Sequence, residues 1–258
     1  TGPTSLTIPS SVTIISLHAF QDYSKLTSVT IPSSVTEFGE GAFYRFSSLI
    51  SVTIPSSVTT IGKSAFRGCT SLTSITIPSS VTEIGESAFK GCFSLTSITI
   101  PSSVTEIGED AFYGCSLLTS VTILSSVTTI GGSAFECCAS LTSVTIPSSV
   151  TKIGVYAFKE CFSLISVSMS SSATKIGDKA FAQCGITSIT IPTTCAFECQ
   201  PFDPDVTFTY LTPEGMRFFD RLATARWSRA ITRCKPQLFA WYERAALELG
   251  SFSTDGAG

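Results

Sequence analysis

The chain has few charges, one histidine, no asparagine and no long apolar run, and each shortage excludes a class of protein. Only 14% of the 258 residues are charged and the net charge is −3, which excludes a basic surface for wholesale nucleic-acid binding. No run approaches the ~18 consecutive apolar residues that a membrane-spanning helix needs. The absence of asparagine excludes N-linked glycosylation sites. A Ser-His-Asp or Cys-His mechanism would have to use His18, which we expect to be a solvated residue on a variable turn.

What the chain has instead is an internal repeat of 23 residues. One clean unit runs from Leu72 to Ser94 and reads LTSITIPSSVTEIGESAFKGCFS. Such self-similarity is the signature of a repeat architecture, so it decides the fold prediction. The clearest markers are eight Ala-Phe pairs, whose phenylalanines recur at intervals of 23: Phe20, Phe43, Phe66, Phe89, Phe112, Phe135, Phe158 and Phe181.

The pattern within one unit predicts one coil of a solenoid. Residues 95–100 alternate between apolar and Ser or Thr, which is typical of a short strand with one buried face. Pro101 turns the chain, residues 104–107 form a second short extended stretch, and 109–115 read as a helical turn or short helix. One unit cannot bury its own apolar residues, whereas stacked units can. We therefore predict an α/β repeat solenoid with short strands on one face.

The repeat, written LxxIxIPxSVTxIGxxAFxxCxS, is similar to the unit of the BspA-like leucine-rich repeat family. The resemblance covers about residues 3–200, or eight to nine repeats, and implies a right-handed superhelix. It also implies a protein-binding or adhesive protein, at a cell surface or secreted, with no catalytic residues, cofactor or metal to carry over. We recognise no N-terminal cap, and residues 201–258 follow no repeat. We therefore divide the chain into a solenoid at 1–200 and a C-terminal segment at 201–258.

The ten cysteines raise the question of disulfides or zinc. Cys195 and Cys199 resemble half of a zinc site but lack a second pair and a nearby histidine, so a disulfide or burial under a cap is the favoured interpretation. Cys137 and Cys234 also lie outside the repeat position. The other six share one repeat position and should stack as buried free thiols: Cys69, Cys92, Cys115, Cys138, Cys161 and Cys184.

Recurring carboxylates invite an acid–base interpretation. Glu83 and Glu86 have the same spacing as Glu106 and Glu109, but the equivalent positions of other repeats hold Thr, Lys, Gly or Val. We therefore interpret them as variable exposed surface. No phosphate-binding glycine motif occurs either, and we expect no enzymatic activity.

Outward-facing threonines form two rows at strand spacing, which we take as the candidate interaction surface. One interpretation is a low-charge protein-contact face, a second is an ice-binding array, and a third is a strand residue copied passively with each repeat. The strand row comprises Thr53, Thr76, Thr99, Thr122 and Thr145. The second row, beyond the proline turn, includes Thr82, Thr105 and Thr128.

The C-terminal segment has a helical pattern. Thr212-Pro213-Glu214 is typical of a helix start, and residues 236–249 read as a second, aromatic helix that ends at Gly250. The helices would cap the last repeat, dock into a larger complex, or place a basic amphipathic face on a membrane or in a calmodulin-like groove. The candidate docking residues are Arg217, Arg221, Arg226, Trp227, Arg229, Arg233, Trp241 and Tyr242.

These observations predict a non-enzymatic protein–protein interaction or scaffolding module, either free or as a subunit of a larger assembly. The alternatives are a cell-surface adhesin fragment and an ice-binding protein. We expect protein partners and no nucleic acid. A cell-surface or secreted location follows from the resemblance, and an organellar or intracellular complex stays open as the alternative.

Overall fold

A computed structural model describes residues 4–16, 19–20, 25–169, 174–192 and 195–210. The chain divides into two units, Thr1–Leu211 and Thr212–Gly258. The second unit lies outside the described residues, and so do the predicted C-terminal helices and all eight candidate docking residues. In the described part, no helix has the length and hydropathy needed to cross a membrane.

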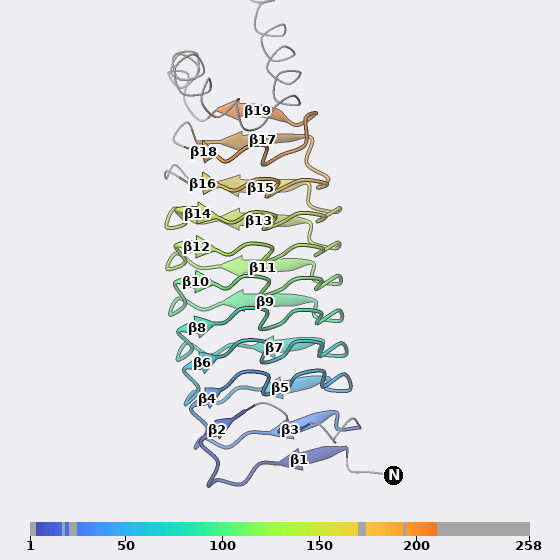
Figure 1. Cartoon of the computed structure of the whole chain (residues 1–258), viewed down its shortest axis with the longest axis vertical. Helices are drawn as coiled ribbons and strands as arrows, with labels where there is room; N and C mark the ends of the chain where they lie inside the picture. Colours follow the sequence, from blue (N-terminus) through green and yellow to red (C-terminus); the bar gives the residue numbers. More distant parts are fainter. Residues whose placement is uncertain (1–3, 17–18, 21–24, 170–173, 193–194, 211–258) are drawn as a thin grey trace, which may run out of the picture. The chain divides into compact units, whose positions relative to one another are not determined.

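The described residues form a solenoid of parallel strands (Figure 1). The longer strands lie on one face, in a four-stranded sheet followed by a six-stranded sheet. The first sheet contains β1 (Ser5–Thr7), β3 (Ser28–Thr30), β5 (Ser51–Thr53) and β7 (Ser74–Thr76). The second contains β9 (Ser97–Ile100), β11 (Ser120–Ile123), β13 (Ser143–Ile146), β15 (Ser166–Met169), β17 (Ser188–Ile191) and β19 (Thr207–Tyr210).

A second face is made of two-residue strands in one nine-stranded sheet. Its members are β2 (Ile14–Ile15), β4 (Glu37–Phe38), β6 (Thr60–Ile61), β8 (Glu83–Ile84), β10 (Glu106–Ile107), β12 (Thr129–Ile130), β14 (Lys152–Ile153), β16 (Lys175–Ile176) and β18 (Ala196–Phe197). The expected strands on one face are present, and the second extended stretch predicted at 104–107 contains β10. The second extended stretch of each unit pairs with its neighbours as a ladder of its own.

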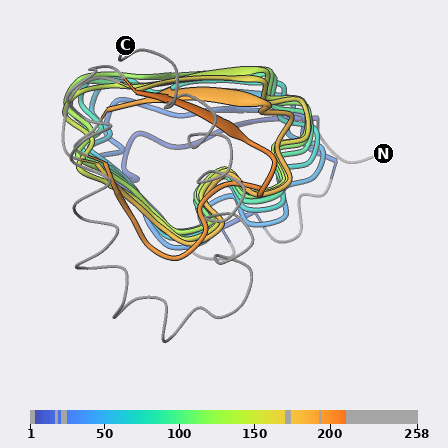
Figure 2. The same ribbon diagram turned by 90° about the horizontal axis from the view of Figure 1, so that it is seen from above.

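The α/β assignment is also corrected, because the described residues contain strands and turns but no helix. The expected helical turn at 109–115 is a run of turns. Its backbone enters the left-handed region at Asp110 (φ 57°) and again at Gly114 (φ 72°), and an α-helix cannot continue through such residues. Viewed along the stack, successive coils follow nearly the same outline (Figure 2).

Equivalent residues of successive units stack on one another, because the strands pair in a register of 23 residues, which is the length of the repeat. Ile98 pairs with Val121, and Thr99 pairs with Thr122. The buried phenylalanines form a continuous stack in which Phe89 and Phe112 lie 5.1 Å apart between ring centroids and are 3° from parallel. Such offset rings add to the stabilisation that their buried area already provides. The repeat therefore builds one continuous core along the solenoid.

The solenoid continues past residue 200. Strand β19 pairs with β17 in parallel register, and Phe202 stacks on Phe181 at 5.0 Å. Residues 201–210, which we had placed with the C-terminal segment, thus contribute one more shortened coil.

The cysteine column is confirmed. Each thiol of the column donates a hydrogen bond to the carbonyl of a phenylalanine 26 residues earlier, as from Cys92 Sγ to Phe66 O at 3.2 Å. Burial raises the pKa of these thiols, to about 12 for Cys69 and Cys115, so they are neutral near pH 7. They act as packing groups of the core.

Candidate functional site

The strand row of threonines lies on the outer surface of the longer strands. The register places Thr53 beside Thr76 and Thr99 beside Thr122, and all four side chains are exposed. Thr145 continues the row and pairs with Ser168. Among the described residues, no partner accepts a hydrogen bond from these hydroxyls. The row therefore presents methyl and free hydroxyl groups outward, with no charge.

The second row of threonines is exposed too, but the hydroxyls of Thr82 and Thr128 are tied to the backbone of the preceding coil. Thr82 Oγ1 donates to the carbonyl of Thr59 at 3.3 Å, and Thr128 Oγ1 donates to the carbonyl of Thr105 at 3.1 Å. These bonds link one coil to the next. The two rows, which look alike in sequence, therefore differ in what their hydroxyls can offer a partner.

Replacing Thr128 by valine is expected to destabilise the solenoid by about 0.5–1 kcal/mol, because valine keeps the shape and removes one inter-coil hydrogen bond. The matched change Thr122→Val, in the strand row, removes a free hydroxyl and is expected to leave stability nearly unchanged. Urea unfolding of both variants checks this difference. Equal losses would contradict the assignment of separate roles to the two rows.

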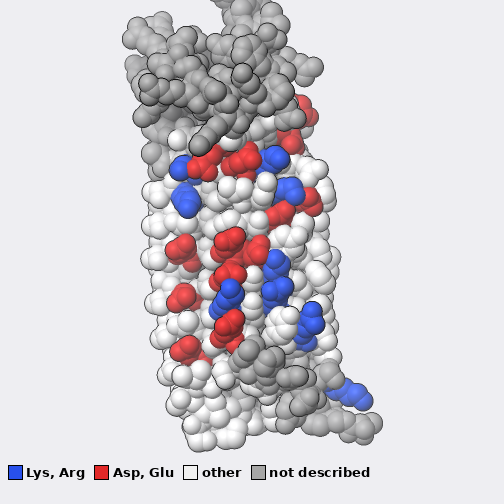
Figure 3. Space-filling model, viewed as in Figure 1, with Lys and Arg blue, Asp and Glu red and all other residues white. Residues whose placement is uncertain are grey.

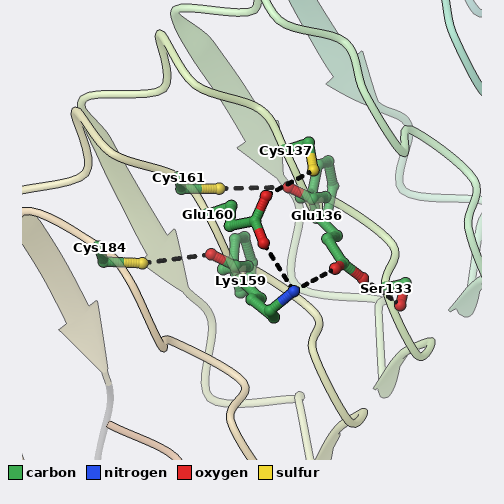
Figure 4. A network of polar contacts seen from close by, with 9 residues as sticks. Ser133, Glu136, Cys137, Lys159, Glu160, Cys161 and Cys184 are labelled. Carbon is green, nitrogen blue, oxygen red and sulfur yellow. Dashed lines mark hydrogen bonds and ion pairs between the residues drawn. The ribbon is translucent and has the colours of Figure 1, made fainter. Parts of the chain in front are cut away.

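A network of polar groups occupies the corner after the phenylalanine position (Figure 4). Lys159 Nζ lies 3.0 Å from Glu136 Oε1 and 2.7 Å from Glu160 Oε1. Ser133 Oγ donates to Glu136 Oε2 at 2.6 Å, and Cys137 Sγ donates to Glu160 Oε2 at 3.3 Å. The buried Glu136 is therefore fully partnered, as a buried charge requires.

The electrostatics of this network indicate a structural role. The hydrogen bond from Lys159 lowers the pKa of Glu160, and the two carboxylates together raise the pKa of Lys159. Burial, followed by the bond to Glu160, raises the pKa of the Cys137 thiol. The thiol is thus neutral near pH 7, whereas nucleophilic cysteines need a lowered pKa. The ion cluster joins two neighbouring coils and holds no activated nucleophile.

The sequence analysis did not identify this network. Its signal was present, since Glu136 and Lys159 occupy the same repeat position, and Cys137 and Glu160 occupy the next. Opposite charges at one position of successive units predict an ion pair across coils, because equivalent positions stack in register.

The remaining cysteines do not form a metal site within the described ranges, where no group of three His, Cys, Asp or Glu side chains comes together. Cys195 is a buried free thiol, and Cys199 is exposed. Cys234 and His18 lie outside the described residues.

The recurring carboxylates are surface groups, as the sequence indicated. Glu83, Glu86, Glu106 and Glu109 are all exposed, and Glu86 pairs with Lys63 at 2.9 Å. Acidic side chains gather along the solenoid, with Lys and Arg side chains beside them (Figure 3). Exposed charges of this kind steer association more than they add affinity.

Comparison with known proteins agrees with this architecture. The model of the BspA type Leucine rich repeat region (6 copies) matches residues 2–117 and 82–200. No protein with a curated description matches the chain.

The solved structures that are similar to this chain include three leucine-rich repeat proteins. A leucine-rich repeat protein from Bacteroides ovatus is 33% identical, with a TM-score of 0.72, over 81% of this chain and 60% of its own. A leucine rich cell surface protein from Faecalibacterium prausnitzii is 31% identical, with a TM-score of 0.63, over 81% and 70%. A leucine-rich repeat protein from T. pallidum is 35% identical, with a TM-score of 0.60, over 66% and 80%. The chain spans less than two thirds of the Bacteroides ovatus protein.

The 23-residue register, the stacked phenylalanines and the family match lead to the same result. This chain belongs to the BspA-type leucine-rich repeat family.

Proposed function

We propose that this chain is a non-enzymatic protein-binding module that uses the face of its longer strands, at a cell surface or after secretion. The observation that carries the proposal is the in-register strand row of uncharged, exposed Thr side chains. Short side chains on rigid strands lose little entropy on binding, and the absence of charge lowers the cost of removing water.

The proposed cell-surface or secreted location rests on a similar protein. The similar Faecalibacterium prausnitzii protein is described as a cell surface protein. A surface location and an adhesive role for this chain are proposals that rest on that likeness. Docking through the predicted C-terminal helices stays a separate prediction.

Affinity capture with the tagged full chain tests the proposal. Thr99→Arg with Thr122→Arg places two long charged side chains on the strand face, and partner recovery is expected to fall at least tenfold. The control Ser102→Arg with Ser125→Arg adds the same charges on exposed serines of the turn after each strand, next to Pro101 and Leu124, and should retain the partner. Equal capture by both variants would contradict the proposal.

Ice binding is the second candidate, because paired threonines of the strand row repeat at the strand spacing of about 4.8 Å. The hydroxyls of Thr82 and Thr128 in the second row argue against it, since they are already bonded to the backbone. We therefore expect neither thermal hysteresis nor inhibition of ice recrystallisation at high protein concentration. Either activity, lost in the Thr99→Arg with Thr122→Arg variant, would favour ice binding instead.

A further inference from the structure

A hollow opens at one corner of the solenoid, over three successive coils that carry glycine at the same repeat position. Gly68, Gly91 and Gly114 all adopt left-handed backbone angles, with φ of 77°, 74° and 72°. They lie in a hollow of about 250 Å³. Its walls include the side chains of Tyr44, Arg45, Arg67, Lys90, Phe93 and Tyr113.

The hollow exists because these glycines have no side chain. A Cβ atom on Gly91 would have no heavy atom nearer than 3.9 Å, and one on Gly114 would reach only the Phe93 ring, at 3.7 Å. Later coils carry Cys137 and Glu160 at the same position, and their side chains belong to the polar network. The space left by the missing side chains is thus confined to the three coils that carry Gly68, Gly91 and Gly114.

The charge of the walls is positive. Arg45 and Arg67 form no ion pair with any residue that the structure describes, and both guanidinium groups lie over the Tyr44 ring, 5.3 and 5.9 Å from its centroid. Lys90 pairs with Asp110 at 2.7 Å and lies 4.2 Å from the Tyr113 ring centroid. Aromatic contact leaves the charge of a guanidinium group uncompensated, so within the described residues no carboxylate neutralises either group.

The hollow also has an apolar wall, which is formed by Phe93. Phe93 is 50% exposed, although a phenylalanine side chain usually packs into a core. The volume is below the ~300–1,000 Å³ of pockets for drug-sized ligands and suits a single apolar side chain. The walls offer N–H donors, and their neighbouring carboxylate, Asp110, is held by Lys90. Hydroxyl groups of Tyr44, Thr70 and Tyr113 also line the hollow, but its charge is positive, so an acidic peptide fits these walls better than a neutral carbohydrate.

Arg45 supplies an independent observation. Its φ of 55° is left-handed, a conformation that costs a non-glycine residue about 1–2 kcal/mol. The next three coils have glycine at that position, so glycine is compatible with the turn. The side chain of Arg45 crosses over Gly68, where an added Cβ would lie 3.3 Å from Arg45 Cγ. Cys137, Glu160 and Gln183 adopt the same conformation at this repeat position, so what distinguishes Arg45 is its positive charge at the rim of the hollow.

We infer that this corner hollow binds an acidic peptide segment of a partner protein, with an aromatic side chain in the hollow and flanking carboxylates on Arg45 and Arg67. The inference rests on the proposed function, because it gives the chemistry of one partner segment. It places that contact at the corner of the coils and away from the strand face.

Fluorescence anisotropy with the full chain and a labelled peptide, Gly-Glu-Asp-Trp-Glu-Asp-Gly, tests the inference. We expect saturable binding that weakens about tenfold in Arg67→Glu and in Phe93→Ala, since each change removes one part of the recognition. Lys152→Glu, a charge reversal at an exposed residue of β14, is the matched control and should bind like the unmodified protein.

One further variant tests whether a loss of binding reflects a loss of folding, and two altered peptides test whether charge alone explains the binding. Arg45→Gly should weaken binding while its thermal stability stays equal or rises, because glycine suits the left-handed turn. Peptides with glycine in place of tryptophan, or lysine in place of the acidic residues, should bind at least tenfold more weakly. The inference is overturned by absent binding of the acidic peptide, by equal binding of either altered peptide, or by an equal loss in Lys152→Glu.

The two proposals fail separately. If the strand-face variant loses its partner while the hollow variants leave peptide binding unchanged, the hollow is refuted and the protein-binding function stands. If the hollow variants lose the peptide but the strand-face variant retains its partner, the use of the strand face is refuted.

Discussion

Replacing Gly131 by alanine is expected to destabilise the solenoid by about 3 kcal/mol or more, whereas the same change at the adjacent Gly132 should cost less than about 1 kcal/mol. The two glycines differ in how closely the previous coil approaches them. A Cβ on Gly131 would lie 2.7 Å from the Glu109 nitrogen and 2.7 Å from the Gly108 carbonyl carbon. Contacts under 3.0 Å are essentially never made by real Cβ atoms.

Relief of this clash would require backbone to move against backbone. A Cβ on Gly132 would meet Val155 O at 3.4 Å and otherwise nothing nearer than 3.9 Å. Neither glycine has a left-handed φ, so the comparison isolates the close approach. The same crowding recurs along the solenoid, at Gly62, Gly85, Gly108, Gly154 and Gly177.

Urea unfolding followed by circular dichroism measures the difference between Gly131→Ala and Gly132→Ala. Similar midpoints for the two variants would show that the coils can separate at little cost, against the close packing described here. A fully unfolded Gly131→Ala protein beside a folded Gly132→Ala protein would support it.

Raising the pH from 8 to 10 is expected to remove on the order of 10 kcal/mol of stability through the six stacked thiols. Burial raises the pKa of Cys115 and Cys184 to about 12, and that of Cys92 well above its usual value. An unfolded thiol loses its proton near pH 8.5. Between these values the unfolded chain binds fewer protons than the folded chain, so each pH step favours unfolding.

The expected loss is about 1.4 kcal/mol per thiol and pH unit above the unfolded pKa, and it continues until the pH reaches the folded pKa near 12. Stability from this source is complete below about pH 8 and declines as the pH rises. Typical domains have only 5–15 kcal/mol to lose, so alkaline unfolding is expected at room temperature.

Two variants identify the thiols as the cause. Cys115→Ala removes one buried thiol and should reduce the pH dependence by that thiol's share, about 1.4 kcal/mol per pH unit. Ser125→Ala changes an exposed residue that is not a thiol and should leave the pH dependence unchanged. Urea unfolding at each pH, with reductant present, provides the measurement. An unchanged slope in Cys115→Ala would assign the alkaline loss to other groups.

Much of the fold was predictable because the repeat is nearly exact. Identical spacing of Ala-Phe pairs requires equivalent residues to stack, so the buried Phe and Cys columns followed directly from the sequence. Helix at the corner was a wrong prediction, since residues such as Asp110 gave no sign of a left-handed turn. The extra coil was missed because Phe202 follows Phe181 by 21 residues instead of 23. A shorter loop changes the spacing between the two phenylalanines in the sequence, but their rings still stack.

The candidate sites divide in the same way. The threonine rows could be listed from the sequence, but the hydroxyl bond from Thr128 to the previous coil depends on a distance between coils. The corner hollow was not predicted, because glycine at 68, 91 and 114 reads as an ordinary turn residue. Its character comes from side chains of different coils, such as Tyr44, Arg67 and Phe93, that the stack brings together.

The sequence by itself determined the family, the coil length and which residues face the core, because a strict period specifies the register between neighbours. Only the tertiary structure decided which exposed groups are free and which are already bonded, and where the surface is hollow. Those properties depend on distances between non-equivalent side chains on successive coils, and a period contains no information about them.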